Sequence, residues 1–365
     1  MALRCGIVGL PNVGKSTLFN SLSRARAESA NYPFCTIEPN IGIIPVPDSR
    51  LDHIAQQVKP EEVTPTSIEF VDIAGLVKGA SQGEGLGNQF LANIRQTDAI
   101  IHILRCFDDD NVAHVDAGVD PVRDKQIVDT ELQLKDLETL ENRREKLDKQ
   151  AKSGDKEVRR LIQVLDRYHR HISRGNPAHT LQPAREEKDM VRDLQLLTDK
   201  PVLYVCNVDE QSVDQGNQYV DQVKEEVEQE DAEVVVIAAS VEAEIAELND
   251  EDERRMFLED LGLRDSGLTR LIRSAYKLLR LNTFFTAGPK EVRAWTARRG
   301  TKAPQAGGII HSDFERGFIK AEVIKYEDFV RHGSEAACRE AGKIHLEGKN
   351  YVVQDGDIIH FKFNV

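Results

Sequence analysis

The sequence predicts an α/β fold in which helices cover both faces of a mostly parallel sheet. Short runs of apolar and β-branched residues recur along the first two thirds of the chain, and helical or loop segments separate most of them. The six runs are Leu3–Val8, Ile41–Val46, Ile68–Ile73, Ile100–Leu104, Val202–Cys206 and Val234–Ala238. Several are apolar at nearly every position, as expected for strands that are buried on both faces. A functional site is therefore expected in the loops at their carboxyl ends.

The first of these loops carries a Gly-x4-Gly-Lys-Ser sequence from Gly9 to Ser16, followed by a helix-like stretch. In this motif backbone N–H groups and the helix N-terminus cradle phosphates, which predicts a nucleoside triphosphate as ligand. Lys15 is expected to contact the β and γ phosphates and to act in catalysis, and the Ser16 hydroxyl to bind Mg2+. The predicted nucleotide contacts of this loop are Asn12, Val13, Gly14, Lys15, Ser16 and Thr17.

Two further segments are predicted to complete the phosphate site. The third apolar run ends in Asp72-Ile73-Ala74-Gly75, where Asp72 can orient Mg2+ through water and the Gly75 N–H can turn toward a γ-phosphate. Thr36, between the first helix and the second strand, is expected to complete the metal shell. A glycine-rich segment follows Gly75, and such a segment can order on a γ-phosphate and relax without it.

The fifth apolar run is followed by Asn207-Val208-Asp209-Glu210, at the place where GTPases carry Asn-Lys-x-Asp. The lysine is absent and the last carboxylate is one methylene longer, so guanine selectivity should weaken. Asn207 is expected to bond a purine edge beside Glu210, and Val208 and Phe107 to supply apolar walls. Ser240 resembles the fifth loop of the same kind of fold.

A highly charged stretch between the fourth and fifth runs predicts two antiparallel helices joined near Ser153-Gly154, the second ending before Gly175. Either a stabilising pair or a partner-binding arm fits this pattern. From Thr283 onward short strands are expected, among them Gly307–Ile310, Tyr351–Asp357 and Ile358–Phe363. The predicted domains are a nucleotide-binding domain (1–123 and 200–282), an inserted helical hairpin (124–199) and a small α+β domain (283–365).

The composition restricts the partners and the compartment. The formal net charge is −14, and most of this net negative charge lies in 200–282, so a polyanion could still approach the helical insertion or the C-terminal domain. The five cysteines form no CxxC pair, which favours reduced thiols and a cytoplasmic location. No apolar stretch approaches the roughly 20 residues of a membrane span, and no recognition of DNA sequence is expected.

Together the motifs resemble the Obg-like ATPases of the YchF subfamily, within the translation-factor-related class of P-loop GTPases. The resemblance covers nearly the whole chain and rests on Gly9–Ser16, Asn31–Asn40, Asp72–Gly87 and Asn207–Glu210. It implies a P-loop G domain, an inserted helical coiled-coil hairpin and a C-terminal ubiquitin-like TGS domain. It further implies that ATP is preferred over GTP, that hydrolysis is slow and that the ribosome or ribosomal RNA is a partner.

The hydrolytic water lacks an obvious ligand in this sequence. Small GTPases commonly carry a glutamine after the Asp-x-x-Gly motif, whereas this chain has Leu76, whose side chain cannot orient water. Three alternatives remain: His114, a residue supplied by a partner, or a bound K+ ion with Asn12 among its ligands. A solvated loop histidine without a catalytic role is an equally good interpretation of His114.

Three functions fit these observations. The leading hypothesis is a ribosome-associated ATPase switch that hydrolyses ATP slowly. A GTPase with relaxed base selectivity is the nearest alternative, and an RNA- or ribosome-binding scaffold with a vestigial nucleotide site belongs to a different class.

Overall fold

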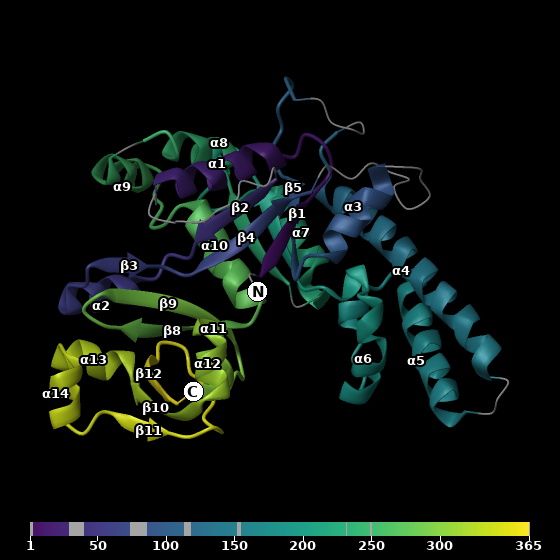
Figure 1. Cartoon of the computed structure of the whole chain (residues 1–365). Coiled ribbons are helices and arrows are strands. Elements are labelled where there is room, and N and C mark those ends of the chain that lie inside the picture. Colours follow the sequence, from purple (N-terminus) through teal and green to yellow (C-terminus); the bar gives the residue numbers. More distant parts are fainter. Residues whose placement is uncertain are drawn as a thin grey trace. The chain divides into compact units, whose positions relative to one another are not determined.

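The computed structural model describes residues 3–28, 40–73, 86–112, 118–151, 155–230, 232–248 and 250–364. The chain divides into two compact units, shown together in Figure 1 and considered separately below. The first unit comprises Met1–Ile43 and Glu69–Ala275, and the second comprises Ile44–Ile68 and Tyr276–Val365.

A six-stranded sheet forms the centre of the first unit, and all six apolar runs are confirmed as its strands. In sheet order these are β2 (Ile41–Pro45), β4 (Ser67–Asp72), β1 (Arg4–Val8), β5 (Ala99–Arg105), β6 (Val202–Asn207) and β7 (Glu233–Ile237). The pairings that join β4, β1, β5, β6 and β7 are all parallel. Every residue of β5 is buried, in keeping with a central strand that is covered on both faces.

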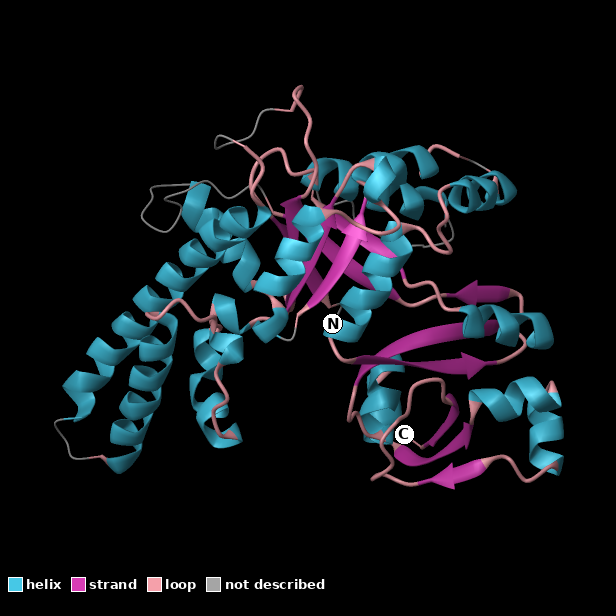
Figure 2. Cartoon of the chain, turned by 180° about the vertical axis from the view of Figure 1, so that it is seen from behind, coloured by secondary structure: helices cyan, strands magenta, loops and turns pink. Residues whose placement is uncertain are grey.

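Helices flank this sheet on both sides, as Figure 2 shows from behind. They are α1 (Lys15–Glu28), α3 (Leu86–Arg95), α4 (Pro121–Ala151), α7 (Gln218–Glu226), α8 (Ala239–Ile245), α9 (Glu251–Asp260) and α10 (Gly267–Leu278). Buried residues of β5 and β6, such as Leu104 and Cys206, share one apolar cluster with Val220 and Val223 of α7 and Val241 of α8. None of the described helices is both long enough and apolar enough to cross a bilayer.

The helical insertion has the predicted form of two long helices. Helix α4 pairs with α5 (Lys156–Ile172) around an apolar core that includes Leu140, Leu147, Leu165 and Tyr168. The second helix ends at Ile172, shortly before Gly175 adopts a left-handed backbone with φ of 84°. Short helical segments return the chain to β6: η1 (Ala178–Thr180), α6 (Arg185–Val191), η2 (Arg192–Leu194) and η3 (Leu197–Asp199).

One buried carboxylate ties the base of the insertion to the returning chain. Asp136 of α4 has no exposed surface, and its carboxylate accepts hydrogen bonds from the backbone N–H groups of Leu197 and Thr198 and from the Thr198 hydroxyl, at 2.7–2.8 Å. Burial raises the pKa of Asp136, and the three donors oppose this shift. A carboxylate with three donors is well satisfied inside the protein, so it anchors α4 against η3.

The second unit contains a mixed six-stranded sheet. Its strands are β11 (His345–Glu347), β10 (Phe318–Ile324), β12 (Ile358–Phe363), β8 (Leu281–Ala287), β9 (Glu291–Arg298) and β3 (Glu62–Thr64). The hairpin β8–β9 is antiparallel, and β12 lies parallel to β8 and antiparallel to β10. The helices of this unit are α2 (Ser49–Val58), α11 (Ala303–Ile310), α12 (Ser312–Arg316), α13 (Tyr326–His332) and α14 (Glu335–Glu340).

The division into two units differs from the expected domains in two segments, residues 44–68 and 276–282, which both lie in the second unit. Residues 44–68 were assigned to the nucleotide-binding domain, but α2 and β3 lie in the second unit. Strand β3 extends the edge of β9 in parallel, and Leu51 and Ile54 of α2 pack in one cluster with Phe285. An amphipathic helix must bury its apolar face, and here the available face belongs to the C-terminal sheet.

Two strand predictions in the C-terminal region were wrong. The segment Gly307–Ile310 is the end of helix α11, which begins with a proline in its first turn, where the missing N–H costs nothing. Gly307 packs closely there, because a Cβ atom would lie 3.2 Å from Phe314 and 3.3 Å from Phe361. The segment Tyr351–Asp357 forms one isolated bridge, from Val352 to Lys302, rather than a strand.

Candidate nucleotide site

The phosphate loop lies between β1 and α1, where the sequence placed it. Gly14 has φ of 99°, and a Cβ atom at this position would lie 2.3 Å from the Asn207 side-chain nitrogen. Both the backbone angle and the close approach therefore require glycine. Asn12 also adopts a left-handed backbone, with φ of 62°, a conformation that asparagine tolerates better than most residues.

A cavity of about 530 Å³ opens beside this loop at the carboxyl end of the sheet. Its walls come from the loops after β1, β5, β6 and β7. The lining residues are Asn12, Gly14, Lys15, Ser16, Thr17, Phe107, Asp108, Asp109, Val112, Asn207, Val208, Asp209, Glu210, Ala239 and Ser240. The structure thus brings together the predicted phosphate, base and fifth-loop residues in one space. Val13, also predicted, is buried beneath the loop and offers its carbonyl group instead.

Lys15 is buried beneath the phosphate loop, with 8% of its surface exposed. Its ammonium group donates hydrogen bonds to the carbonyl oxygens of Gly9 and Leu10, at 3.0 and 2.7 Å. Burial lowers the pKa of Lys15 to about 8, although the charge of Asp72 acts in the opposite direction. A phosphate entering the loop would present a stronger acceptor for this ammonium than the two neutral carbonyl groups do.

The residues predicted to hold a metal ion fit Mg2+ as far as they are described. Asp72 is the last residue of β4, and its Oδ1 atom is buried without a hydrogen-bond partner among the described residues. Burial raises the pKa of Asp72, and the charge of Lys15 opposes the rise. Ser16 lines the cavity from the first turn of α1. A buried carboxylate oxygen without a donor is costly, and a metal-bound water would satisfy it.

Asn207 fastens the phosphate loop to the start of α8. Its side-chain nitrogen donates to the Val13 carbonyl and its side-chain oxygen accepts from the Ala239 N–H, both at 2.9 Å. Asn207 is 5% exposed, so these bonds are shielded from water. Asp209 and Glu210 both line the cavity, and the Asp209 carboxylate accepts from the Ser212 N–H at 2.9 Å and caps the short helix η4 (Glu210–Ser212).

Sequence reasoning missed two polar residues that hold the loop after β5. Arg105, the last residue of this strand, is 2% exposed and donates to backbone carbonyl groups of the loop. Asn217 donates to the Cys106 carbonyl at 2.7 Å and also caps α7. The only sequence signal for Arg105 was a charged residue at the end of an otherwise apolar run, and Asn217 gave none.

Several predicted residues fall outside the part of the chain that the structure describes. They are Thr36, Gly75 and His114, together with Leu76. Their proposed parts in metal binding, γ-phosphate contact and hydrolysis therefore stay predictions from the sequence.

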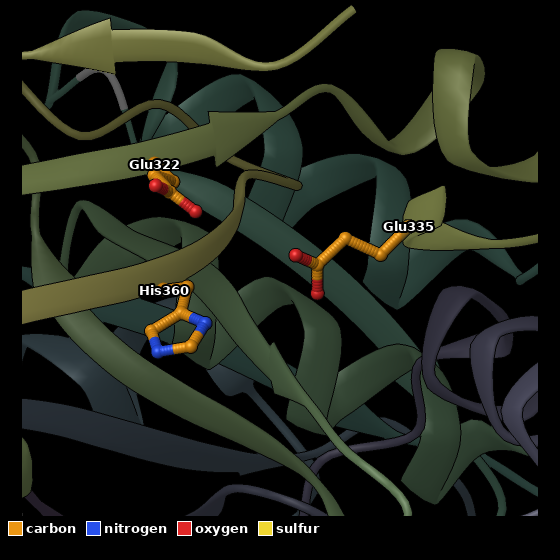
Figure 3. A group of neighbouring side chains, drawn as sticks. All are labelled: Glu322, Glu335 and His360. Carbon is orange, nitrogen blue, oxygen red and sulfur yellow. The ribbon is translucent and has the colours of Figure 1, made fainter. Parts of the chain in front are cut away.

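A second group of side chains, in the C-terminal unit, has a spacing that could suit a metal ion. Glu322, Glu335 and His360 point toward one another in Figure 3, with their ligand atoms within 4.8 Å. However, Arg339 donates to both carboxylates, at 3.1 and 3.0 Å, and Lys362 lies 3.8 Å from Glu322. These cations lower the pKa of Glu322 against the effect of burial, so ion pairs already satisfy the cluster.

A phosphate loop at a strand-to-helix junction, a carboxylate at the end of β4 and an Asn-x-x-Glu segment after β6 define a nucleotide-binding protein of the P-loop GTPase class. A family model described as "50S ribosome-binding GTPase" matches residues 4–137. The YchF-GTPase C-terminal model, described as a protein of unknown function (DUF933), matches residues 281–364.

Relatives extend this match over the whole chain. The chain is 54% identical over 367 residues to the Ribosome-binding ATPase YchF of Bacillus subtilis and 53% identical over 365 residues to that of Escherichia coli O157:H7, with full coverage of both proteins in each case. This protein belongs to the YchF family.

Solved structures agree with this assignment. The Schizosaccharomyces pombe YchF GTPase matches with a TM-score of 0.91 and 37% identity, over 99% of this chain and 97% of that one. A GTP binding protein of Pyrococcus horikoshii, 16% identical with a TM-score of 0.61 over 99% of this chain and all of that one, shares the fold.

Proposed function

We propose that this protein is a Mg2+-dependent ATPase of the ribosome, which hydrolyses ATP slowly, and GTP less well, and acts as a nucleotide-dependent switch. The main observation behind the proposal is the cavity. It joins a complete phosphate loop to a wall that carries Val208 and Glu210 in place of the lysine and aspartate that select guanine. The names of the relatives, Ribosome-binding ATPase YchF, support both the nucleotide and the partner. A ribosomal partner in turn favours a cytoplasmic location.

Each described residue has a distinct part in this function. The N–H groups of the loop from Gly9 to Ser16 and the Lys15 ammonium bind the phosphates. Ser16 and Asp72 would hold Mg2+, the latter through water, and the metal would supply positive charge that offsets the charge of the phosphates. Val208 and Phe107 would enclose the base beside Glu210, whose carboxylate accepts from the adenine amino group in place of a guanine contact.

The hydrolytic step depends on residues that are predicted from the sequence alone. With Leu76 in place of a water-orienting glutamine, intrinsic hydrolysis should be slow. His114, a K+ ion held in part by Asn12, or a group supplied by the ribosome would complete the site. Thr36 and Gly75 would respond to the γ-phosphate, as switch segments of this class do.

The test is to measure ATP hydrolysis and ribosome co-sedimentation with ATP, ADP or no nucleotide. We expect slow hydrolysis by the protein alone, and ribosome binding that changes between ATP and ADP. Lys15→Ala should remove both the hydrolysis and the nucleotide response. If Lys15→Ala binds ribosomes with an unchanged nucleotide response, the switch hypothesis is wrong, and a ribosome-binding scaffold with a vestigial nucleotide site is favoured. If GTP is hydrolysed in preference to ATP, the protein is a GTPase with relaxed selectivity.

A further inference from the structure

The loop that follows β5 forms one wall of the nucleotide cavity but has little apolar packing of its own. Phe107, Asp108, Asp109 and Val112 line the cavity. Residues 108–111 are exposed, and Phe107 and Val112 are only partly buried. A loop of this kind needs polar anchors to hold one conformation, since it buries few apolar groups.

Arg105 supplies that anchor from beneath the loop. Its guanidinium donates from Nε to the Phe107 carbonyl at 3.1 Å, from Nη1 to the Val112 carbonyl at 2.9 Å and from Nη2 to the Asp109 carbonyl at 3.1 Å. The carbon at the centre of the guanidinium also lies 4.7 Å from the centre of the Phe107 ring. One buried cation thus fixes three carbonyl groups across six residues and one face of the aromatic ring.

The same contacts exclude a direct role for Arg105 at the phosphates. Each of its three guanidinium nitrogens is bonded to a backbone carbonyl, and the residue is 2% exposed. Moving it toward a γ-phosphate would leave three carbonyl groups without their donor, at a large cost. Arg105 therefore cannot serve as an arginine finger in this arrangement.

We infer that Arg105 is a positioning residue for the nucleoside part of the ligand: it sets the wall formed by Phe107 and Asp109, and acts on the base and sugar rather than on the phosphates. The inference rests on the proposed nucleotide binding. It separates the cavity into a phosphate end held by Asn207 and Lys15 and a nucleoside end held by Arg105.

The test compares a nucleotide with a ligand that has phosphates but no nucleoside. ATP and inorganic tripolyphosphate, each with Mg2+, are titrated into the wild-type protein and into Arg105→Gln, Arg105→Lys and Arg254→Gln. Arg254 is the matched control, since its guanidinium also donates to a backbone carbonyl, that of Leu248, but does not line the cavity. Circular dichroism and thermal unfolding identify the variants that fold.

Arg105→Gln is expected to weaken ATP binding by about tenfold or more, and tripolyphosphate binding by less than about twofold. Arg105→Lys keeps the charge but reaches fewer carbonyl groups, so its ATP affinity should lie between those of Arg105→Gln and the wild type; it also tests the inference if Arg105→Gln does not fold. Arg254→Gln should match the wild type for both ligands.

Two results would overturn the inference: unchanged ATP affinity in folded Arg105 variants, or equal losses for ATP and tripolyphosphate. A wild-type protein that binds no ATP would instead contradict the proposed function, so the two failures are distinguishable.

Discussion

The two ends of the nucleotide cavity are built in different ways. The phosphate end is one continuous segment, Gly9 to Ser16, held between a strand and a helix, with Lys15 buried under it. The nucleoside end is assembled from the loops after β5, β6 and β7, which are distant in the sequence. Backbone groups and glycines shape the first end, with the Asn207 side chain as its anchor, whereas the second end consists of side chains presented by separate loops, one of them anchored by Arg105.

This difference determines which substitutions each end of the cavity can tolerate. Phosphate binding by backbone N–H groups needs a fixed chain path, and Gly14 has no room for any side chain. We expect base recognition to depend on a few side chains at the cavity wall, so one methylene in Glu210 or a valine at position 208 can change selectivity while the phosphate loop keeps its path. The ends should therefore respond differently to substitution.

The largest effect is expected at the phosphate end, for Lys15→Ala. The substitution removes the cation that faces the β and γ phosphates, so ATP and GTP should both bind about 100-fold more weakly or worse. Titration with fluorescent analogues of both nucleotides measures this loss. If ATP binding survives in a folded Lys15→Ala protein, the phosphates do not occupy the loop from Gly9 to Ser16.

Asn207→Ala sharpens the boundary between the two ends. The variant loses two buried hydrogen bonds, to Val13 and from Ala239, so the free energy of unfolding should fall by about 2 kcal/mol. The phosphate loop also loses its attachment, so ATP and GTP should weaken by similar factors. Chemical denaturation and competition binding measure these effects. A loss confined to one nucleotide would show that Asn207 mainly reads the base.

Val208→Lys combined with Glu210→Asp tests the nucleoside end alone. The double substitution restores the lysine and aspartate of the GTPase motif and leaves Asp209 to cap η4. The ratio of GTP to ATP affinity should rise by about tenfold. Thermal stability should fall, because Val208 is 2% exposed and packs in an apolar cluster where a lysine is costly. Glu210→Gln is the control, because its side chain keeps the length of glutamate. An unchanged ratio would place the base elsewhere.

The smallest expected effect is on the pH dependence of ATP binding. Burial lowers the pKa of Lys15 to about 8 in the free protein, and a bound triphosphate should raise it by favouring the ammonium. Binding then takes up a proton, so affinity is full below pH 8 and falls as the pH rises past it. Calorimetry between pH 7.5 and 9 should show a decrease of less than about tenfold per pH unit. If the affinity for ATP instead rises between pH 7.5 and 9, loss of the Lys15 proton does not weaken ATP binding, and the prediction is wrong.

The features that depend on contiguous residues could be predicted from the sequence. The six apolar runs became the six strands of the first sheet, and the residues from Asn12 to Thr17 meet Asn207 and Val208 as expected. Strands buried on both faces and a motif fixed by glycine leave few alternatives. The two helices of the insertion were predictable for the same reason, since their apolar spacing is regular.

The remaining features depend on contacts between distant segments. Helix α2 lies against the C-terminal sheet because Leu51 and Ile54 pack in the apolar cluster of that sheet. The local sequence of α2 does not indicate which sheet it will cover. The helix at Gly307 could not be predicted from local sequence because glycine disfavours helices, whereas here Gly307 packs closely against Phe314, which follows in the next helix. Arg105 was missed since its partners are backbone carbonyl groups, which carry no sequence signature.

The most direct test of the account is a competition titration of the wild-type protein. A fluorescent ATP analogue is bound in the presence of Mg2+ and displaced by unlabelled ATP or GTP. Displacement at a lower concentration of ATP than of GTP is the predicted result, because Val208 and Glu210 replace the guanine-specific pair. Displacement at a lower concentration of GTP would contradict the assignment of the nucleoside end, and no binding of either nucleotide would contradict the site itself.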